Sequence, residues 1–183
     1  MGYFITGETI IKDTDVPGMK QAMNNQLYYD NDGKIYLCPK KQIFDGYTIP
    51  RWLAWIAGGR FQFDARCSRQ HDIECSTHKK IVVNMSLTEL KLGRYLFNYE
   101  GETYCMDLPT TCLDVQPTSF IETNKRFKRM LETIKTIPKW RVWLFYVGVH
   151  FNFGWWIDKF TKKITPIDLD CLYEGGSDKW KNS

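Results

Sequence analysis

Residues 119–134 read SFIETNKRFKRMLETI and contain the clearest helix signal in the chain. Ser119 and Glu122 fit the capping-box pattern, in which two side chains accept hydrogen bonds from the free amides at the start of a helix. Large apolar side chains then repeat at helical spacing, which predicts one buried stripe along this helix. The stripe residues are Phe120, Phe127, Leu131 and Ile134.

Asn124 falls on the same stripe, one turn from Phe120 and Phe127. A buried amide that loses its water and finds no partner costs roughly 1–3 kcal/mol. We therefore expect Asn124 to hydrogen-bond across the core, either to His71 or to the loop that contains Asp45. The alternative is a purely structural amide that ties the helix to a loop.

Three more helices are predicted from capping residues and prolines. Asp64 suits the N-cap of a helix over residues 65–77, and Pro138 suits the start of a helix over residues 139–153. A short helix over residues 51–56 follows Pro50.

Strand signals are shorter and weaker than the helix signals. Two strand-like runs, residues 26–29 and 34–38, flank a segment that ends in Asp32-Gly33, and an Asp-Gly pair favours a tight hairpin. Further strands are expected at residues 42–44, 81–85 and 95–99.

These signals together predict an α+β fold, in which three longer helices pack together with a small antiparallel sheet or hairpin. Residues 1–25 mix turn formers with isolated apolar residues and are expected to form an N-terminal arm. Residues 26–157 form a single globular domain with an irregular insertion at about residues 79–117. Residues 158–183 form a polar C-terminal tail.

Charge and composition narrow the possible partners. The chain has 183 residues, and 25 Lys and Arg against 21 Asp and Glu give a net charge of +4. No run of like charge concentrates this excess, whereas a dedicated nucleic-acid-binding protein usually has a clustered basic stripe, so we expect no specific nucleic-acid partner. Aromatic residues make up 15% of the chain, which favours contact with a protein partner; the alternative is that these rings simply fill the core.

No transmembrane segment is expected. The most apolar stretch, residues 140–156, is interrupted by Arg141, His150 and Asn152, and a span needs about 20 apolar residues. We interpret it as a buried helix; the alternative is that its aromatic residues lie at a membrane interface.

Six cysteines occur without a repeated spacing, and no secretory signal precedes them. Reduced thiols in a cytosolic product are therefore expected. Should disulfides form later, in an extracellular particle, Cys105 and Cys112 are the best candidates.

Several common catalytic signatures are missing from the sequence, including H-E-x-x-H, G-x-S-x-G and the phosphate-binding loop. The remaining candidate is the His71-Asp72 pair. The two side chains project about 100° apart on a helix, so they cannot serve one atom. His71 suits a general base acting on water, and Asp72 suits a hard cation such as Ca²⁺. The alternative is a half-buried histidine beside a solvated or salt-bridged aspartate.

Cys67, His71 and Cys75 share one helical face, as zinc ligands would. Cys67 and Cys75 are about 12 Å apart along the axis at 1.5 Å per residue, so both cannot bind one ion. Small buried core residues explain these cysteines better. No cofactor is firmly indicated; Ca²⁺ and Zn²⁺ are the candidates if a divalent cation binds.

Three segments, in order, resemble a phage-associated family of unknown function, domain-of-unknown-function 1353. Residues 44–51, FDGYTIPR, resemble its T-D-G-A-S-x-P-R signature; residues 65–72, ARCSRQHD, resemble A-x-x-x-H-D; and residues 122–127, ETNKRF, resemble E-A-D-R-x-F. The resemblance extends from residue 44 to about residue 156 and leaves residues 79–116 largely unmatched.

The resemblance implies that six polar residues lie together in one cluster: Asp45, Thr48, Arg51, His71, Asp72 and Asn124. A looser similarity to phospholipase A2-like motifs implies a histidine that activates water and an aspartate that binds calcium. The chain departs from the family where Asn124 replaces an aspartate and where Glu74-Cys75 replaces Leu-Tyr. If the family's aspartate orients the histidine, an amide in its place favours the wrong histidine tautomer. In the serine-protease triad, this exchange lowers turnover about 10⁴-fold.

The leading hypothesis is a phage structural or interaction protein with a degenerate His-Asp cluster, a tail or neck component that assembles with other virion proteins or with itself. It would be located in the virion, or in the host cytoplasm before assembly. The competing hypothesis is a metal-assisted hydrolase of ester or amide bonds in a lipid or cell-wall substrate. His71 would then be the base, Asn124 its orienter, and Asp45 and Asp72 the metal ligands. A host-directed binding protein is the third hypothesis.

Overall fold

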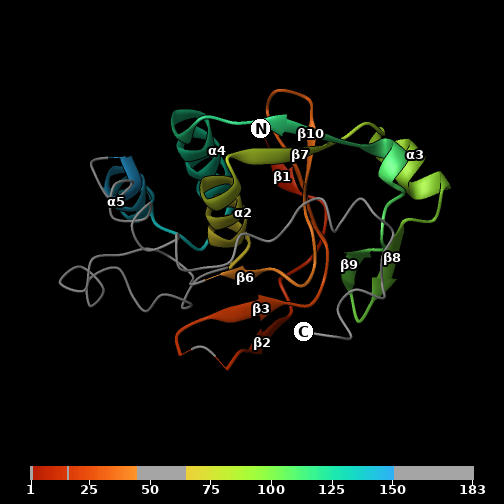
Figure 1. Cartoon of the computed structure of the whole chain (residues 1–183), viewed down its shortest axis with the longest axis horizontal. Coiled ribbons are helices and arrows are strands. Elements are labelled where there is room, and N and C mark those ends of the chain that lie inside the picture. The colour runs from red at the N-terminus through yellow and green to blue at the C-terminus, as the bar shows by residue number, and fades with distance from the viewer. Residues whose placement is uncertain (1, 16, 45–64, 151–183) are drawn as a thin grey trace.

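The computed structural model describes residues 2–15, 17–44 and 65–150 (Figure 1). Within these ranges the largest element is a five-stranded antiparallel sheet with the strand order β1-β4-β5-β7-β10. Its strands are β1 (Tyr3–Phe4), β4 (Gln26–Tyr29), β5 (Ile35–Cys38), β7 (Lys79–Val83) and β10 (Leu113–Pro117).

Two smaller antiparallel sheets accompany the main sheet. One is three-stranded, with the order β2-β3-β6, and the other is a two-stranded hairpin of β8 and β9. Their strands are β2 (Ile11–Asp13), β3 (Lys20–Ala22), β6 (Ile43–Phe44), β8 (Leu96–Tyr99) and β9 (Glu102–Cys105).

Four α-helices and one 3₁₀ turn are described. They are α2 (Ala65–Thr77), α3 (Leu87–Leu92), η1 (Thr110–Cys112), α4 (Phe120–Thr133) and α5 (Lys139–His150). Figure 1 shows α2, α4 and α5 toward one side of the molecule, with α3 and the β8–β9 hairpin toward the other.

The β4–β5 hairpin forms as its turn sequence predicts. The side chains of Asp30 and Asp32 accept hydrogen bonds from the backbone amides of Asn31 and Lys34, at 2.8 and 3.0 Å. Gly33 adopts a φ of 79°, a left-handed conformation that costs glycine little. Local side-chain bonds and one glycine therefore set the register of the two central strands.

The two faces of the main sheet belong to different cores. Tyr28, Tyr36 and Val82 point toward α2 and α4, and the apolar residues of α5 extend the same cluster. Leu27, Leu37 and Ile81, with their neighbours, point to the opposite face, where Leu90 of α3 and Cys105 of β9 cover them. Alternation along each strand thus separates a helix-covered face from a face that α3 and the hairpin cover.

Both α3 and α4 begin at serine caps. The Ser119 hydroxyl accepts a hydrogen bond from the amide of Glu122, at 3.2 Å, which is one half of the predicted capping box; the Glu122 carboxylate pairs with Lys80 and Arg126. Ser86 and Glu89 form a complete capping box at the start of α3. The pattern Ser86-Leu87-Thr88-Glu89 contains the same signal, although α3 was not among the helices predicted from the sequence.

A buried guanidinium joins α4 to α2 and to the sheet. Arg126 is 1% exposed; it forms an ion pair with Glu74 of α2 and a second with Glu122, at 3.1 Å. Its guanidinium lies over the ring of Tyr36, 4.1 Å from the centroid. A cation held this way has both counter-charge and an aromatic face in place of water.

The partners of Arg126 are themselves bonded to other elements. Glu74 also accepts hydrogen bonds from Gln70, at 2.7 Å, and Thr123, at 3.1 Å. Glu122 pairs with Lys80 of β7. Asp30, in the hairpin turn, receives two hydrogen bonds from Arg129 of α4, at 2.8 and 2.5 Å. The network therefore connects the hairpin, α2, α4 and β7 through the buried charges of Arg126, Glu74 and Asp30 and through partly exposed partners at its edge.

A second buried guanidinium fixes α2 to the strand ends. Arg69 is fully buried, and its Nη2 donates to the backbone carbonyls of Asn24, Cys38 and Pro39, at 2.7, 3.1 and 2.5 Å. These contacts set the position of α2 along the sheet.

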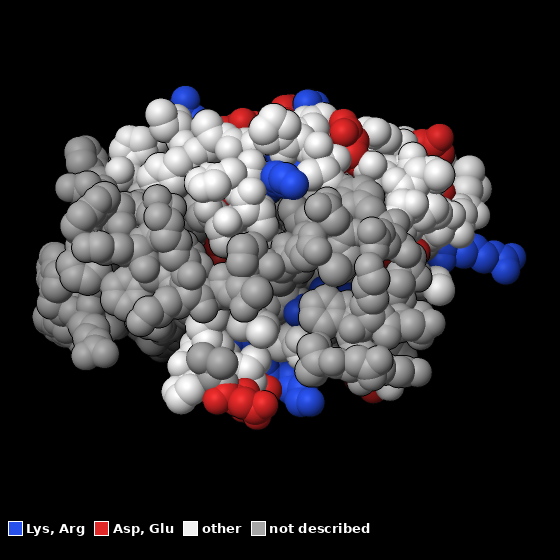
Figure 2. Space-filling view, in the orientation of Figure 1, with Lys and Arg blue, Asp and Glu red and all other residues white. Residues whose placement is uncertain are grey.

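On the face shown in Figure 2, the described acidic and basic residues are interspersed and do not gather into a patch of one sign.

The prediction of a mainly helical core with a small sheet is wrong. The described residues contain ten strands in three antiparallel sheets, and only three of the four helices reach seven residues. Residues expected to form an arm contain β1, β2 and β3, and the expected irregular insertion supplies β7 and β10 to the main sheet. Strands of two to five residues are too short to show clear alternation, so the stronger helix periodicity dominated the prediction.

We expect Arg126→Leu to lower the free energy of unfolding by about 3–5 kcal/mol, because it leaves Glu74 buried without its cation. The double variant Arg126→Leu/Glu74→Leu should recover most of this loss. Lys128→Ala, which removes an exposed pair with Glu132 on the same helix, should cost less than about 1 kcal/mol. Urea unfolding measures all three; equal losses for Arg126→Leu and Lys128→Ala would contradict the assignment.

Asp30 should contribute to acid unfolding. Burial alone would raise its pKa, but hydrogen bonds from Arg129 and Asn31 and the charges of Arg129 and Arg126 lower it below the usual 3.8. A lowered pKa stabilises the fold above about pH 4, and this contribution is lost as the pH falls through the folded-state pKa. Asp30→Asn should therefore flatten the loss of stability below pH 4 in urea unfolding, whereas the exposed Asp13→Asn should leave that slope unchanged.

Candidate functional site

His71, one of the two partners considered for Asn124, is in contact with it; the other, the loop containing Asp45, falls outside the described residues. His71 lies on the second turn of α2 and Asn124 on the second turn of α4, two helices that pack against each other. The Nε2 atom of His71 is 2.9 Å from Oδ1 of Asn124. His71 is 3% exposed and Asn124 is fully buried.

The second bond of Asn124 determines how the histidine is protonated. The amide Nδ2 donates to the carbonyl of Val149 in α5, at 3.3 Å, so Oδ1 faces the imidazole. Nε2 of His71 must then carry the hydrogen that it donates to this oxygen. Asn124 therefore connects all three long helices through two hydrogen bonds.

Apolar and sulfur atoms complete the surroundings of the ring. The ring of Phe127 lies 4.6 Å from that of His71, centroid to centroid, and Sγ of Cys75 lies 3.5 Å from Nε2. On the other side, Nδ1 is 3.7 Å from a carboxylate oxygen of Asp72. Burial alone would lower the pKa of His71, but Cys75, Asn124 and Glu74 around it raise the pKa above its usual 6.5.

The remaining residues of the predicted polar cluster are only partly placed. Asp72 lies beside His71, whereas Asp45, Thr48 and Arg51 fall outside the described residues. Within the described ranges, no three His, Cys, Asp or Glu side chains lie together in a way that could hold a metal ion.

The cysteines considered for a disulfide, Cys105 and Cys112, are both free thiols. Their sulfurs donate to the backbone carbonyls of Met106 and Pro109, at 3.2 and 2.9 Å. Burial raises the pKa of Cys105 to about 12, which keeps it a thiol at neutral pH.

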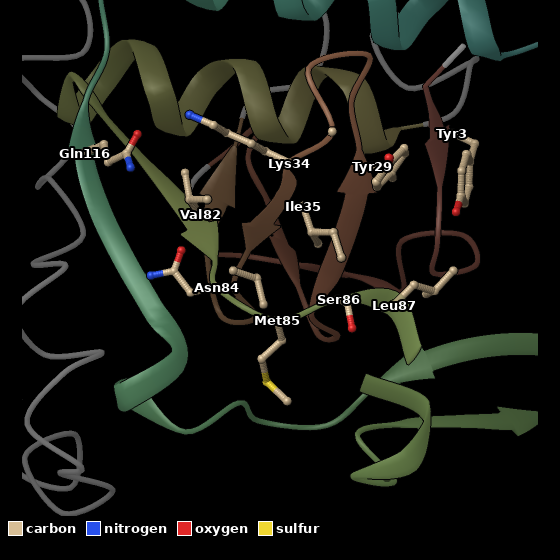
Figure 3. Close-up of a pocket in the computed structure, with 12 residues that line it drawn as sticks. Tyr3, Tyr29, Lys34, Ile35, Val82, Asn84, Met85, Ser86, Leu87 and Gln116 are labelled. Atoms are coloured by element: carbon tan, nitrogen blue, oxygen red, sulfur yellow. The ribbon is translucent and has the colours of Figure 1, made fainter. Parts of the chain in front are cut away.

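A separate cleft of about 560 Å³ opens on the face of the main sheet opposite α2 and α4. Figure 3 shows Tyr3 and Tyr29 along one side, Asn84 and Gln116 along the other, and Ile35 between them. The side chain of Lys34 extends across one end of the cleft, and Met85, Ser86 and Leu87 lie at the opposite end. A concave site of this size, with an apolar centre and a few polar groups, is typical of small-molecule binding.

The sequence contained no pattern that identified this cleft. Its residues come from five strands, the β4–β5 turn, the loop after β7 and the start of α3, and cross-strand pairing places the strand residues together. The available signal was the capping box at Ser86, which would have revealed α3 and one end of the cleft.

Comparison with protein-family models, with curated proteins and with solved structures finds no match for the chain. None of the helices in the described ranges is both long enough and apolar enough to span a lipid bilayer.

The position of Asn124 allows a direct test of the His71 environment. A raised pKa means that His71 stabilises the fold fully below pH 6.5 and that this contribution is lost as the pH rises through the folded-state pKa. Asn124→Asp places a carboxylate against the ring, so we expect the pKa of His71 to rise further and the loss of stability to move to higher pH.

NMR titration of the His71 imidazole in the native protein and in Asn124→Asp measures this change, with the exposed His78 as the reference signal. Asn124→Leu, which removes the hydrogen bonds to His71 and Val149, should lower the free energy of unfolding by roughly 1–3 kcal/mol. A lower His71 pKa in Asn124→Asp would contradict the assigned contact.

Proposed function

We propose that the protein acts by binding other proteins, as a structural or interaction component of a phage particle, in its tail or neck. The observation that carries this proposal is that His71 is buried. The competing hydrolase hypothesis requires His71 as its general base. A general base must come within hydrogen-bonding reach of a substrate proton. A buried imidazole bonded to Asn124 instead favours a role in holding α2 against α4.

Exposed aromatic side chains support a binding role. Trp140 and Trp143 on α5 are 51% and 62% exposed, and Phe97 and Tyr99 on β8 are 47% and 60% exposed. Figure 1 shows α5 and β8 at opposite sides of the molecule. Rigid aromatic rings are enriched at protein interfaces because they bury a large area with little loss of conformational freedom. Two separated aromatic surfaces suit a protein with two neighbours.

The link to a phage particle rests on the resemblance of three sequence segments to a phage-associated family. Two of these segments lie in α2 and α4, and they meet at the contact between His71 and Asn124. That contact supports treating the segments as parts of one pattern. The proposed location is accordingly the virion, or the host cytoplasm before assembly.

Quantitative mass spectrometry of particles purified from the phage or prophage that carries the gene tests this proposal. We expect a defined copy number per particle that persists through density-gradient purification. A protein absent from purified particles, or phospholipid or cell-wall hydrolysis that is lost in His71→Ala, would contradict the proposal and favour the metal-assisted hydrolase. A host-directed binding protein would be recovered with a host protein and not with particles.

The aromatic surface of α5 provides a second test in the same particles. We expect Trp140→Ala/Trp143→Ala to reduce the copy number per particle severalfold, because both rings are exposed and contribute little to the core. Leu92→Ala on α3 is the matched control, since its side chain is 77% exposed on a different element. Equal incorporation of both variants would exclude the α5 surface as the contact.

A further inference from the structure

The cleft on the far face of the main sheet follows one row of cross-strand neighbours. Tyr3 pairs with Tyr29, Tyr29 with Ile35, and Ile35 with Val83. Directly paired residues point to the same face of a sheet, so these four side chains form one continuous surface. The adjacent row on this face is covered by α3 and the β8–β9 hairpin, and the cleft begins where that cover ends.

The surface of this row is aromatic at one end and aliphatic at the other. The rings of Tyr3 and Tyr29 lie 5.3 Å apart, centroid to centroid, at an angle of 34°. Tyr3 is 42% exposed, so part of its ring is available for contact. Ile35 and Val83 form a nearly buried floor beside the rings. A flat apolar body placed here would bury its own faces against these side chains.

Lys34 brings a positive charge to the rim of the cleft, and just outside the lining the carboxylate of Asp114 accepts a hydrogen bond from Gln116, at 2.7 Å. Lys34 is the one charged residue among its described lining residues, and Asn84 contributes an amide on the opposite side (Figure 3). Asp32, two positions before Lys34, is already engaged by the hydroxyl of Tyr36, at 2.6 Å, and by the amide of Lys34. An acid group on a ligand would find an ammonium donor near the end of the cleft and no carboxylate among the described lining residues.

We propose that this cleft binds a small aromatic anion, with its rings against Tyr3 and Tyr29 and its acid group beside Nζ of Lys34. The inference is independent of the role proposed for the whole protein, because it uses none of the residues of α2, α4 or α5. A ligand of this class combines the apolar area that the row offers with the single charge that the rim can neutralise.

Two fluorescent dyes separate the contribution of the charge from that of the rings. The probe 8-anilino-1-naphthalenesulfonate is an aromatic anion, and N-phenyl-1-naphthylamine has the same rings without the sulfonate. We expect the anion to bind the native protein more tightly than the neutral dye. Lys34→Gln should weaken the anion about three- to tenfold and leave the neutral dye unchanged. Lys12→Gln, at an exposed position in β2, is the matched control and should change neither dye.

Tyr3→Ala tests the aromatic side of the cleft and should weaken both dyes about threefold or more, whereas Tyr99→Ala, which removes an exposed ring on β8, should weaken neither. Lys34 is exposed, so the charge comparison holds even if Tyr3→Ala loosens β1. Binding of the anion should also weaken with added salt in the native protein and not in Lys34→Gln. Unchanged affinity of the anion in Lys34→Gln, or of both dyes in Tyr3→Ala, would overturn the proposal.

Discussion

The ion pair between Arg126 and Glu74 is the constraint on which the rest of the fold depends. Both side chains are 1% exposed, so neither charge is hydrated, and each requires the other to remain in the core. Glu122 pairs with Arg126 within α4, but the buried counter-charge of Arg126 is Glu74 of α2 and its aromatic face is the ring of Tyr36. The pair therefore selects one arrangement of helices on the sheet, which apolar contacts alone would leave less defined.

The contacts around this pair extend the same constraint to the remaining elements. Arg129 joins α4 to the turn of the β4–β5 hairpin through Asp30, and Glu122 joins it to β7 through Lys80. Asn124 adds α5 by bonding both His71 and the Val149 carbonyl. Polar residues in this core thus position helices, and the histidine that a hydrolase would need belongs to the same structural set.

This arrangement divides the molecule into two faces with different properties. The helix-covered face contains the buried ion pair of Arg126 with Glu74, the buried guanidinium of Arg69 and the hydrogen bond between His71 and Asn124. The opposite face is covered for only part of its length, because α3 is six residues long and the β8–β9 hairpin is short. The uncovered part of that face is the cleft beside Tyr3 and Tyr29, so binding there does not require the polar core to open.

The sequence by itself determined the local elements whose signals lie within a few residues. Helices α2, α4 and α5 and the hairpin around Asp32-Gly33 lie close to where capping residues, prolines and glycine predicted them. One polar residue on an apolar stripe also indicated that Asn124 needs a partner across the core, and His71 was one of the two partners considered. Tertiary structure alone decided the rest: Arg126 pairs with a residue 52 positions away and Arg129 with one 99 positions away. Such pairings, like the registers of strands two to five residues long, depend on the closure of long loops around a shared core, and no periodicity within one segment encodes them.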